Sequence, residues 1–223
     1  METLIQSFFN LEILAQAWPI LLHGLWMTFL LTLVVVPLGI GGGLVVALAS
    51  GSRRRLVRWS TVVYVDFFRA FPPLVLLMLI AYGLPFLNIR IGAFASVALA
   101  FLLNTSSYYG EVLRAGIESV PRGQMEAARS TGLTQGQAMA WIVLPQAIRN
   151  VTPDLISNTL EVIKLTSIAS VVALPELLHA AREAQSLTFN ATPIVAAAIL
   201  YLVCLWPLVR LLSRFEHRQI AVH

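Results

Sequence analysis

The chain of 223 residues is 58% hydrophobic and only 12% charged, with a mean hydropathy of +0.80. A soluble domain of this length needs more surface charge, so the composition excludes that class and indicates an integral membrane protein of about five spans of roughly 20 residues. The net charge of +4 comes from loop arginines, and no basic stripe with interleaved aromatic residues indicates a nucleic acid partner.

The N-terminal part predicts one long apolar element. Residues 1–17 mix apolar and polar side chains and predict a short interfacial helix before a first span at 18–49. Within that span Gly39 and Gly43 have GxxxG spacing, which favours close packing against another helix over a bend that contacts a ligand. A basic loop at 52–58 follows.

The second predicted span, 60–86, is interrupted by Pro72 and Pro73. Two prolines free backbone carbonyls, which are tolerated in a membrane where they line a cavity or are satisfied by neighbours. For Arg69, which comes just before the break, structural pairing and solute contact both stay open. Asp66 is expected to form a local salt bridge.

The rest of the chain alternates apolar and polar segments. A third span is predicted at 92–117, a polar platform at 118–149, a fourth span at 150–174, a polar loop at 175–190 and a fifth span at 191–212. No internal repeat or long linker divides the sequence. We therefore expect a single membrane domain over residues 1–223.

Charge counting predicts the orientation. Eleven of the fifteen basic residues fall in segments that the five spans place on one side: Arg53, Arg54, Arg55, Arg58, Arg114, Arg122, Arg129, Arg149, Arg210, Arg214 and Arg218. By the positive-inside rule this side is cytoplasmic. The N-terminus is then outside, and the C-terminus and the platform are in the cytoplasm.

Polar side chains are expected at mid-membrane depth in three spans: Arg69 in the second, Asn104 and Ser107 in the third, Glu161 and Lys164 in the fourth. Charges in a bilayer cost about 2.5–3.5 kcal/mol each on insertion scales and commonly mark a pathway. Glu161 and Lys164, three residues apart, share a helix face. They are either an internal pair that joins helices or part of a polar cavity for a solute with both charges. Tyr108, which follows Ser107, is expected to pack.

Catalytic and cofactor motifs are not found in the sequence. The single lysine, Lys164, does not follow a glycine-rich phosphate loop, so an ATP site must come from another chain. The four histidines are scattered, and the one cysteine, Cys204, has no partner at metal-ligand spacing. We expect a non-enzymatic chain that holds neither a metal nor a cofactor.

The platform carries the most specific pattern. Glu126-Ala127-Ala128, three residues, Gly132, nine residues and then Ile142-Val143-Leu144-Pro145 resemble the EAA loop of permease subunits in bacterial ABC importers. Segments 66–69, 103–108, 111–124, 144–149 and 164–167 extend the similarity to the polar amino acid permeases, the importers of histidine, glutamine, arginine and opines. The resemblance covers about residues 18–213.

The resemblance implies an all-α type I importer fold with five transmembrane helices in the bacterial inner membrane. The implied partners are a cytoplasmic ATPase dimer that binds ATP and Mg²⁺, an identical or related second permease, and a periplasmic solute-binding protein. A coupling helix at about 122–137 would seat in the ATPase, with Glu126, Ala127 and Ala128 facing it and Gly132 allowing the turn.

Three departures from the family pattern fall at the expected solute depth. Arg69-Ala70-Phe71-Pro72-Pro73 replaces the usual Arg-Gly-Thr-Pro, Lys164-Leu165-Thr166-Ser167 replaces Lys-Asp-Thr-Ser, and Glu161 stands where an apolar residue is common. We expect an ATP-driven importer of a polar amino acid or related zwitterion that works by alternating access. The alternative is a secondary transporter or channel that uses Glu161 and Lys164.

Overall fold

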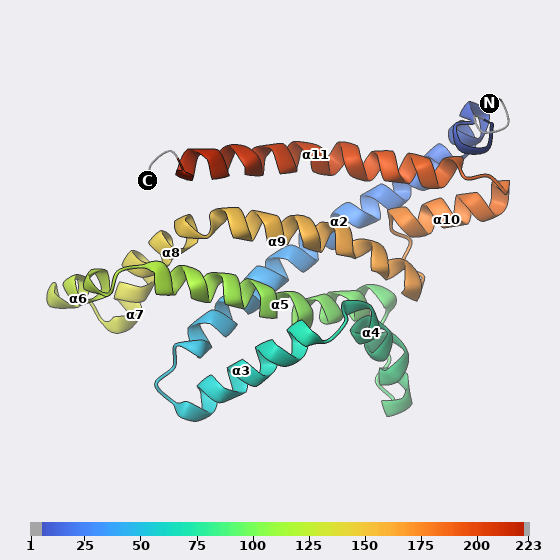
Figure 1. Ribbon diagram of the computed structural model, residues 1–223. Helices are drawn as coiled ribbons and strands as arrows, with labels where there is room; N and C mark the ends of the chain where they lie inside the picture. The colour runs from blue at the N-terminus through green and yellow to red at the C-terminus, as the bar shows by residue number, and fades with distance from the viewer. Residues whose placement is uncertain (1–5, 221–223) are drawn as a thin grey trace. The chain divides into compact units, whose positions relative to one another are not determined.

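The computed structural model describes the backbone of residues 6–220 and the side-chain surroundings of residues 6–210, and every regular element in that range is a helix (Figure 1). The chain divides into two compact units. The first comprises Met1–Val36, Pro73–Ala100 and Leu160–His223, and the second comprises Pro37–Pro72 and Phe101–Thr159. Three helices, α2 (Leu11–Ser50), α5 (Ala93–Ser119) and α9 (Thr152–Leu165), contribute to both units.

Within the described part of the chain, three helical segments are long and apolar enough to cross a membrane: Gln6–Ser50, Thr152–Val172 and Thr192–Arg210. A fourth is reached if Arg55–Ala70 and Pro73–Leu87 together form one broken span. The 27-residue helix α5 is long enough for a further span, but the polar run at 104–109 interrupts its apolar sequence. The all-helical class is confirmed, whereas the count of five spans and the orientation of the termini stay predictions.

The first unit contains the first part of α2, the start of α5, the end of α9 (Thr152–Leu165) and several further helices. These include α4 (Pro73–Met78), the π-helix η1 (Leu79–Gly83), the 3₁₀-helix η2 (Leu84–Leu87), the 3₁₀-helix η4 (Thr166–Val172), α10 (Leu177–Thr188) and α11 (Thr192–Ile220). Its core is made largely of small side chains. Buried Leu21 and Leu177 pack with Ala181, Ala184 and Ala197. These alanines let α2, α10 and α11 approach closely.

Two predictions in this unit are wrong in their boundaries. The predicted polar loop at 175–190 contains the helix α10, because buried residues recur at helical spacing in a sequence too polar to register as a span. A separate interfacial helix was predicted over 1–17, but residues 11–17 already belong to α2, which begins at Leu11. Residues 1–5 lie outside the described part of the chain. Helix α11 continues to Ile220, and its apolar part, Thr192–Arg210, agrees with the span predicted at 191–212.

The second unit contains the end of α2, α3 (Arg55–Ala70), most of α5 and a series of short helices. These are α6 (Arg122–Ser130), α7 (Gln135–Ala138), the π-helix η3 (Met139–Val143), α8 (Leu144–Asn150) and the start of α9. In Figure 1 α6, α7 and α8 gather at the C-terminal end of α5. Arg55 and Arg58, predicted to lie in a loop, are in the first turn of α3, because nothing after Arg54 breaks a helix.

Close packing at the GxxxG pair is confirmed. A Cβ added at Gly43 would lie 2.5 Å from Cβ of Tyr109, and one added at Gly39 would collide with the side chain of Thr105. Conversely, a Cβ at Gly110 of α5 would lie 2.5 Å from a methyl carbon of Val46. The last turns of α2 therefore touch α5 almost backbone to backbone, which only small residues allow.

Candidate functional site

The break after α3 is where the second unit concentrates its polar contacts. Helix α3 ends at Ala70, and the residues four positions after Phe68 and Arg69 are Pro72 and Pro73, which have no N–H to donate. The amide of Asn104 donates to the Phe68 carbonyl at 3.0 Å, and the hydroxyl of Tyr108 donates to the Arg69 carbonyl at 3.3 Å. Two carbonyls that the prolines leave without helical partners thus receive donors from α5.

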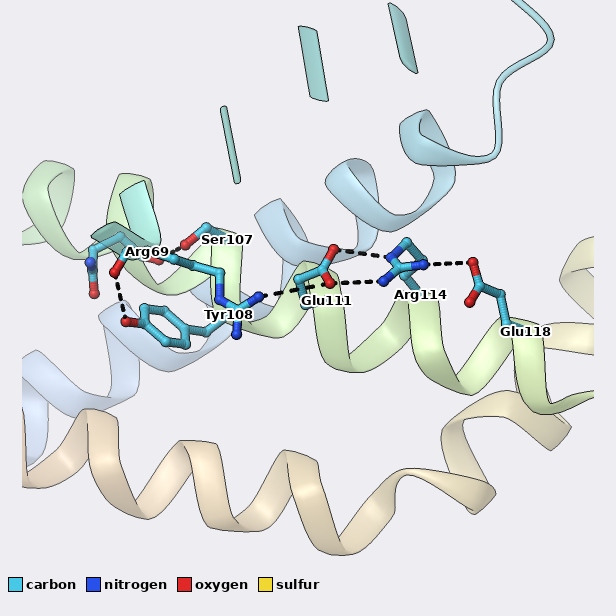
Figure 2. Close-up of polar contacts among 7 residues, drawn as sticks. Arg69, Ser107, Tyr108, Glu111, Arg114 and Glu118 are labelled. Carbon is cyan, nitrogen blue, oxygen red and sulfur yellow. Dashed lines mark hydrogen bonds and ion pairs between the residues drawn. The ribbon is translucent and has the colours of Figure 1, made fainter. Parts of the chain in front are cut away.

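A chain of charged side chains continues along α5 from this point (Figure 2). The Arg69 guanidinium lies 3.8 Å from a carboxylate oxygen of Glu111 and 5.5 Å from the ring centre of Tyr108. Arg114 donates to both oxygens of Glu111, at 3.0 and 2.9 Å, and to Glu118 at 2.7 Å. The four charges alternate in sign, so they neutralise one another along the helix surface.

Three predicted site residues therefore come together in the second unit. Arg69 has a partly exposed side chain, whereas Asn104 and Ser107 are buried. The Ser107 hydroxyl donates to the Asn104 carbonyl at 2.6 Å. In this structure Asn104 joins α5 to α3 and Ser107 bonds within α5, and solute contact by either one stays a prediction.

Two interpretations from the sequence are corrected here. Tyr108 was expected only to pack, but its hydroxyl caps α3 and its ring lies under Arg69. Asp66 was expected in a salt bridge, but among the described residues it forms none. It lies instead on the wall of a cavity of about 400 Å³, together with Arg58, Glu111 and other residues of α2, α3 and α5.

Glu161 and Lys164 belong to the first unit, where they form an ion pair. Both side chains are more than half exposed in the isolated chain. Lys164 also lines a cavity of about 530 Å³ with Ser167, Tyr201 and apolar residues of α11. The pair itself is confirmed, and its use by a solute stays a prediction.

A buried carboxylate that the sequence did not reveal caps α10. Glu176 is fully buried; its oxygens accept hydrogen bonds from the backbone N–H groups of Leu178 and His179 and from the Tyr201 hydroxyl. It lies between two candidate spans, and burial raises the pKa of its carboxyl above the ordinary value despite these hydrogen bonds. The acidic residue directly before a helical run was a usable N-cap signal.

The platform forms a helix, the expected turn at Gly132 and then a second helix. Helix α6 ends at Ser130, and Gly132 has φ +92°, a conformation that side chains other than glycine rarely adopt. Thr134 and Gln137 form a reciprocal capping box at the start of α7. Just before Pro145 the π-helix η3 passes into α8, which begins at Leu144.

The predicted outward face of α6 needs one correction. Glu126 and Ala127 are exposed, but Ala128 is only 7% exposed and points into the chain's own packing. Helix α6 packs on η3, with Met125 against a core of Val120, Val143 and Ala147. A methyl group at position 128 therefore lets α6 lie close to its own chain, so Ala128 does not face a partner.

Among the described residues no group of three or more histidine, cysteine or acidic side chains is arranged to hold a metal ion.

Comparison with known proteins gives consistent matches over most of the chain. The probable amino-acid ABC transporter permease YckA of Bacillus subtilis (strain 168) is 34% identical over 201 residues, covering 89% of each chain. The L-cystine transport system permease TcyB of the same organism is 38% identical over 202 residues, covering 90% of this chain and 85% of the relative.

Solved structures agree with these matches. One described as the crystal structure of an amino acid ABC transporter with histidines is 36% identical, with a TM-score of 0.82, and covers 92% of this chain and 96% of its own. An inward-facing MetNI methionine ABC transporter shares the fold, with a TM-score of 0.73 at 19% identity over 89% and 95% of the two chains. Residues 39–220 match the model of one protein family. The chain therefore belongs to the binding-protein-dependent transport system inner membrane components.

Proposed function

We propose that this chain is the permease subunit of an ATP-driven importer that moves a polar amino acid or a related zwitterion across the bacterial inner membrane. The names of its relatives support this substrate class, since they include permeases for amino acids, cystine and arginine. The chain pairs with a second permease, identical or related. A separate ATPase dimer supplies the ATP and Mg²⁺ chemistry, and a periplasmic solute-binding protein delivers the solute.

The observation that carries this proposal is the platform at α6. A short helix with Glu126 and Ala127 exposed lies between apolar helices and ends in the positive-φ turn at Gly132. An exposed, small-residue helix tip on the cytoplasmic side suits docking in a groove of another protein. Because α6 packs on η3 and on the end of α5, a force on α6 is passed to those helices.

The solute path is assigned to the polar residues of both units. Arg69, Glu161 and Lys164 have exposed charged groups that a solute can reach, whereas Asn104 and Ser107 act by fixing the helix surface beside it. When ATP closes the ATPase dimer, the coupling helices approach each other and the path changes from one open side to the other. The N-terminus is outside and the C-terminus cytoplasmic.

The test compares two glycines of the platform in the importer reconstituted with its ATPase and binding protein. Neither Gly132 nor Gly136 has an atom within 4 Å of an added Cβ, so the two sites differ only in backbone conformation. Valine at Gly132 is strained by about 1–2 kcal/mol or more, because φ is positive there. We expect Gly132→Val to abolish ATP-dependent uptake while inserting normally, and Gly136→Val to keep most of it.

Two outcomes contradict the proposal. Unchanged uptake by Gly132→Val removes the coupling role of the turn. Uptake that needs no ATPase and collapses with a proton or sodium gradient supports the secondary transporter instead.

A further inference from the structure

Arg69 is held in place by contacts that leave most of its donors unused. Its guanidinium lies over the Tyr108 ring, 5.5 Å from the centre, and its ion pair with Glu111 is long at 3.8 Å (Figure 2). The side chain is 47% exposed. A guanidinium carries five N–H donors in a planar fork that matches a carboxylate, so one long ion pair leaves several donors available.

Glu111 does not depend on Arg69 for its own hydrogen bonds. Both of its oxygens already accept from Arg114, at 3.0 and 2.9 Å. Together with Glu118, these three residues carry one excess negative charge, which Arg69 balances. Because the Arg69–Glu111 contact is the longest in this chain of charges and partly exposed, it is the contact that opens most easily.

The backbone that presents Arg69 is fixed from the same stripe of α5. Asn104, Tyr108 and Glu111 follow one another at spacings of four and three residues, so they lie on one helix face. The first two donate to the Phe68 and Arg69 carbonyls, and the third faces the Arg69 guanidinium. The last turn of α3 is therefore held at both its backbone and its side chain.

We propose that Arg69 and Glu111 bind the head group of an α-amino acid, with the α-carboxylate on Arg69 and the α-ammonium on Glu111. Tyr108 is the positioning residue for Arg69. The assignment rests on the proposed import function and names the solute chemistry of one site in its path. The cavity of about 400 Å³ beside Glu111 offers room for the solute's side chain.

Charge balance selects this class of solute. A zwitterionic head group that enters between Arg69 and Glu111 gives each charge a new partner, so no charge is left alone. A simple carboxylic acid would leave the negative excess on Glu111 unbalanced, and a simple amine would leave Arg69 without a partner. Uncompensated charge is costly at a membrane-embedded site, so both are disfavoured.

The experiment measures equilibrium binding of labelled L-arginine, L-glutamine and L-cystine to the purified permease–ATPase complex without the solute-binding protein. We expect Arg69→Gln and Glu111→Gln each to weaken binding by about tenfold or more, the effect of losing one charge-assisted hydrogen bond. Asp154→Asn is the control, because Asp154 is an exposed carboxylate of the same unit, in the first turn of α9, that does not line this cavity. It should bind like the wild type.

Agmatine, which is arginine without its carboxylate, separates recognition from a structural role. It should not displace labelled arginine from the wild type. In Arg69→Gln, agmatine and arginine should compete for the site about equally well, because the carboxylate of arginine has lost its partner. The proposal is overturned if agmatine competes as well as arginine in the wild type, or if Asp154→Asn weakens binding as much as Glu111→Gln.

The positioning role of Tyr108 has its own test. Tyr108→Phe keeps the ring but removes the donor to the Arg69 carbonyl, and should weaken binding several-fold. Pro73→Ala returns a backbone N–H four residues after Arg69, which can donate to the Arg69 carbonyl in place of Tyr108. Tyr108→Phe should therefore weaken binding less in the Pro73→Ala background. An equal loss in both backgrounds contradicts this role. If the wild type binds none of the three amino acids, the proposed binding site is wrong. The import function is then tested separately, by ATP-driven uptake in the presence of the binding protein.

Discussion

Replacing Gly43 by alanine should loosen the contact between the end of α2 and α5. The added Cβ would lie 2.5 Å from Cβ of Tyr109 and 2.9 Å from the backbone nitrogen of Gly110. Both distances are too short for real contacts by several tenths of an ångström to about 1 Å. Neither atom belongs to a flexible side-chain end, and Tyr109 is also tied by its hydroxyl to Thr159 at 2.8 Å. The helices must therefore move apart.

The magnitude follows from a comparison within the same helix. Overpacking a tight contact costs about 1–3 kcal/mol. Alanine is also a better helix former than glycine by about 1 kcal/mol, and this gain must be removed to see the packing cost. Gly41→Ala is the control, since a Cβ at Gly41 meets no atom within 4 Å. This variant therefore shows only the gain in helix propensity.

The assay is thermal unfolding of the detergent-solubilised complex. The two alanine variants should differ by roughly 2–12 °C in midpoint, with Gly43→Ala the less stable, taking about 2–4 °C per kcal/mol for a chain of this size. Equal midpoints for the two variants would refute the close α2–α5 contact. The functional interpretation of the platform would be unaffected, because Gly43 lies outside it.

Two further predictions concern the cap of α10 and the inner face of α6. Glu176→Ala should destabilise the solubilised protein by about 0.5–2 kcal/mol for the lost cap alone, whereas Glu183→Ala on the exposed side of the same helix should change the unfolding midpoint little. Burial raises the Glu176 pKa above 4.5, so the folded protein resists ionising this carboxyl. The wild type should therefore lose stability relative to Glu176→Gln as the pH rises through the raised pKa. A stability difference between the two proteins that does not change with pH contradicts the buried carboxyl. Ala128→Leu should cost about 1–3 kcal/mol of stability, while exposed Ala127→Leu should leave folding intact and reduce ATPase binding in a pull-down; the opposite pattern contradicts the burial of Ala128.

The sequence was informative where a residue's own chemistry decides the backbone. The turn at Gly132 and the break at Pro72-Pro73 were both predicted correctly, because glycine and proline restrict local conformation whatever lies around them. The GxxxG pair likewise predicted close packing. It could not name the partner helix, since small residues specify a short distance and not which surface fills it.

Predictions failed where the neighbouring chain decides. Helix α10 was taken for a loop because its apolar residues occupy only one face, and hydropathy over a window averages this pattern away. Ala128 was assigned outward because the motif gives its spacing and not the rotation of α6 on η3. Asp66 has a plausible partner in every basic loop residue nearby, and only the fold shows that none pairs with it.

The polar residues at 104–111 show how the same side chain can serve the fold and the solute path. A proline break in an apolar helix exposes carbonyls, and the polar donors that satisfy them must come from a neighbouring helix. Asn104 and Tyr108 do this, and one turn further on the same face presents Glu111 to Arg69. A polar stripe in a predicted span is thus explained by the break opposite it. Only the residue left with unused donors, Arg69, needs a further explanation, and that is why the proposed site is centred on it rather than on Asn104 or Ser107.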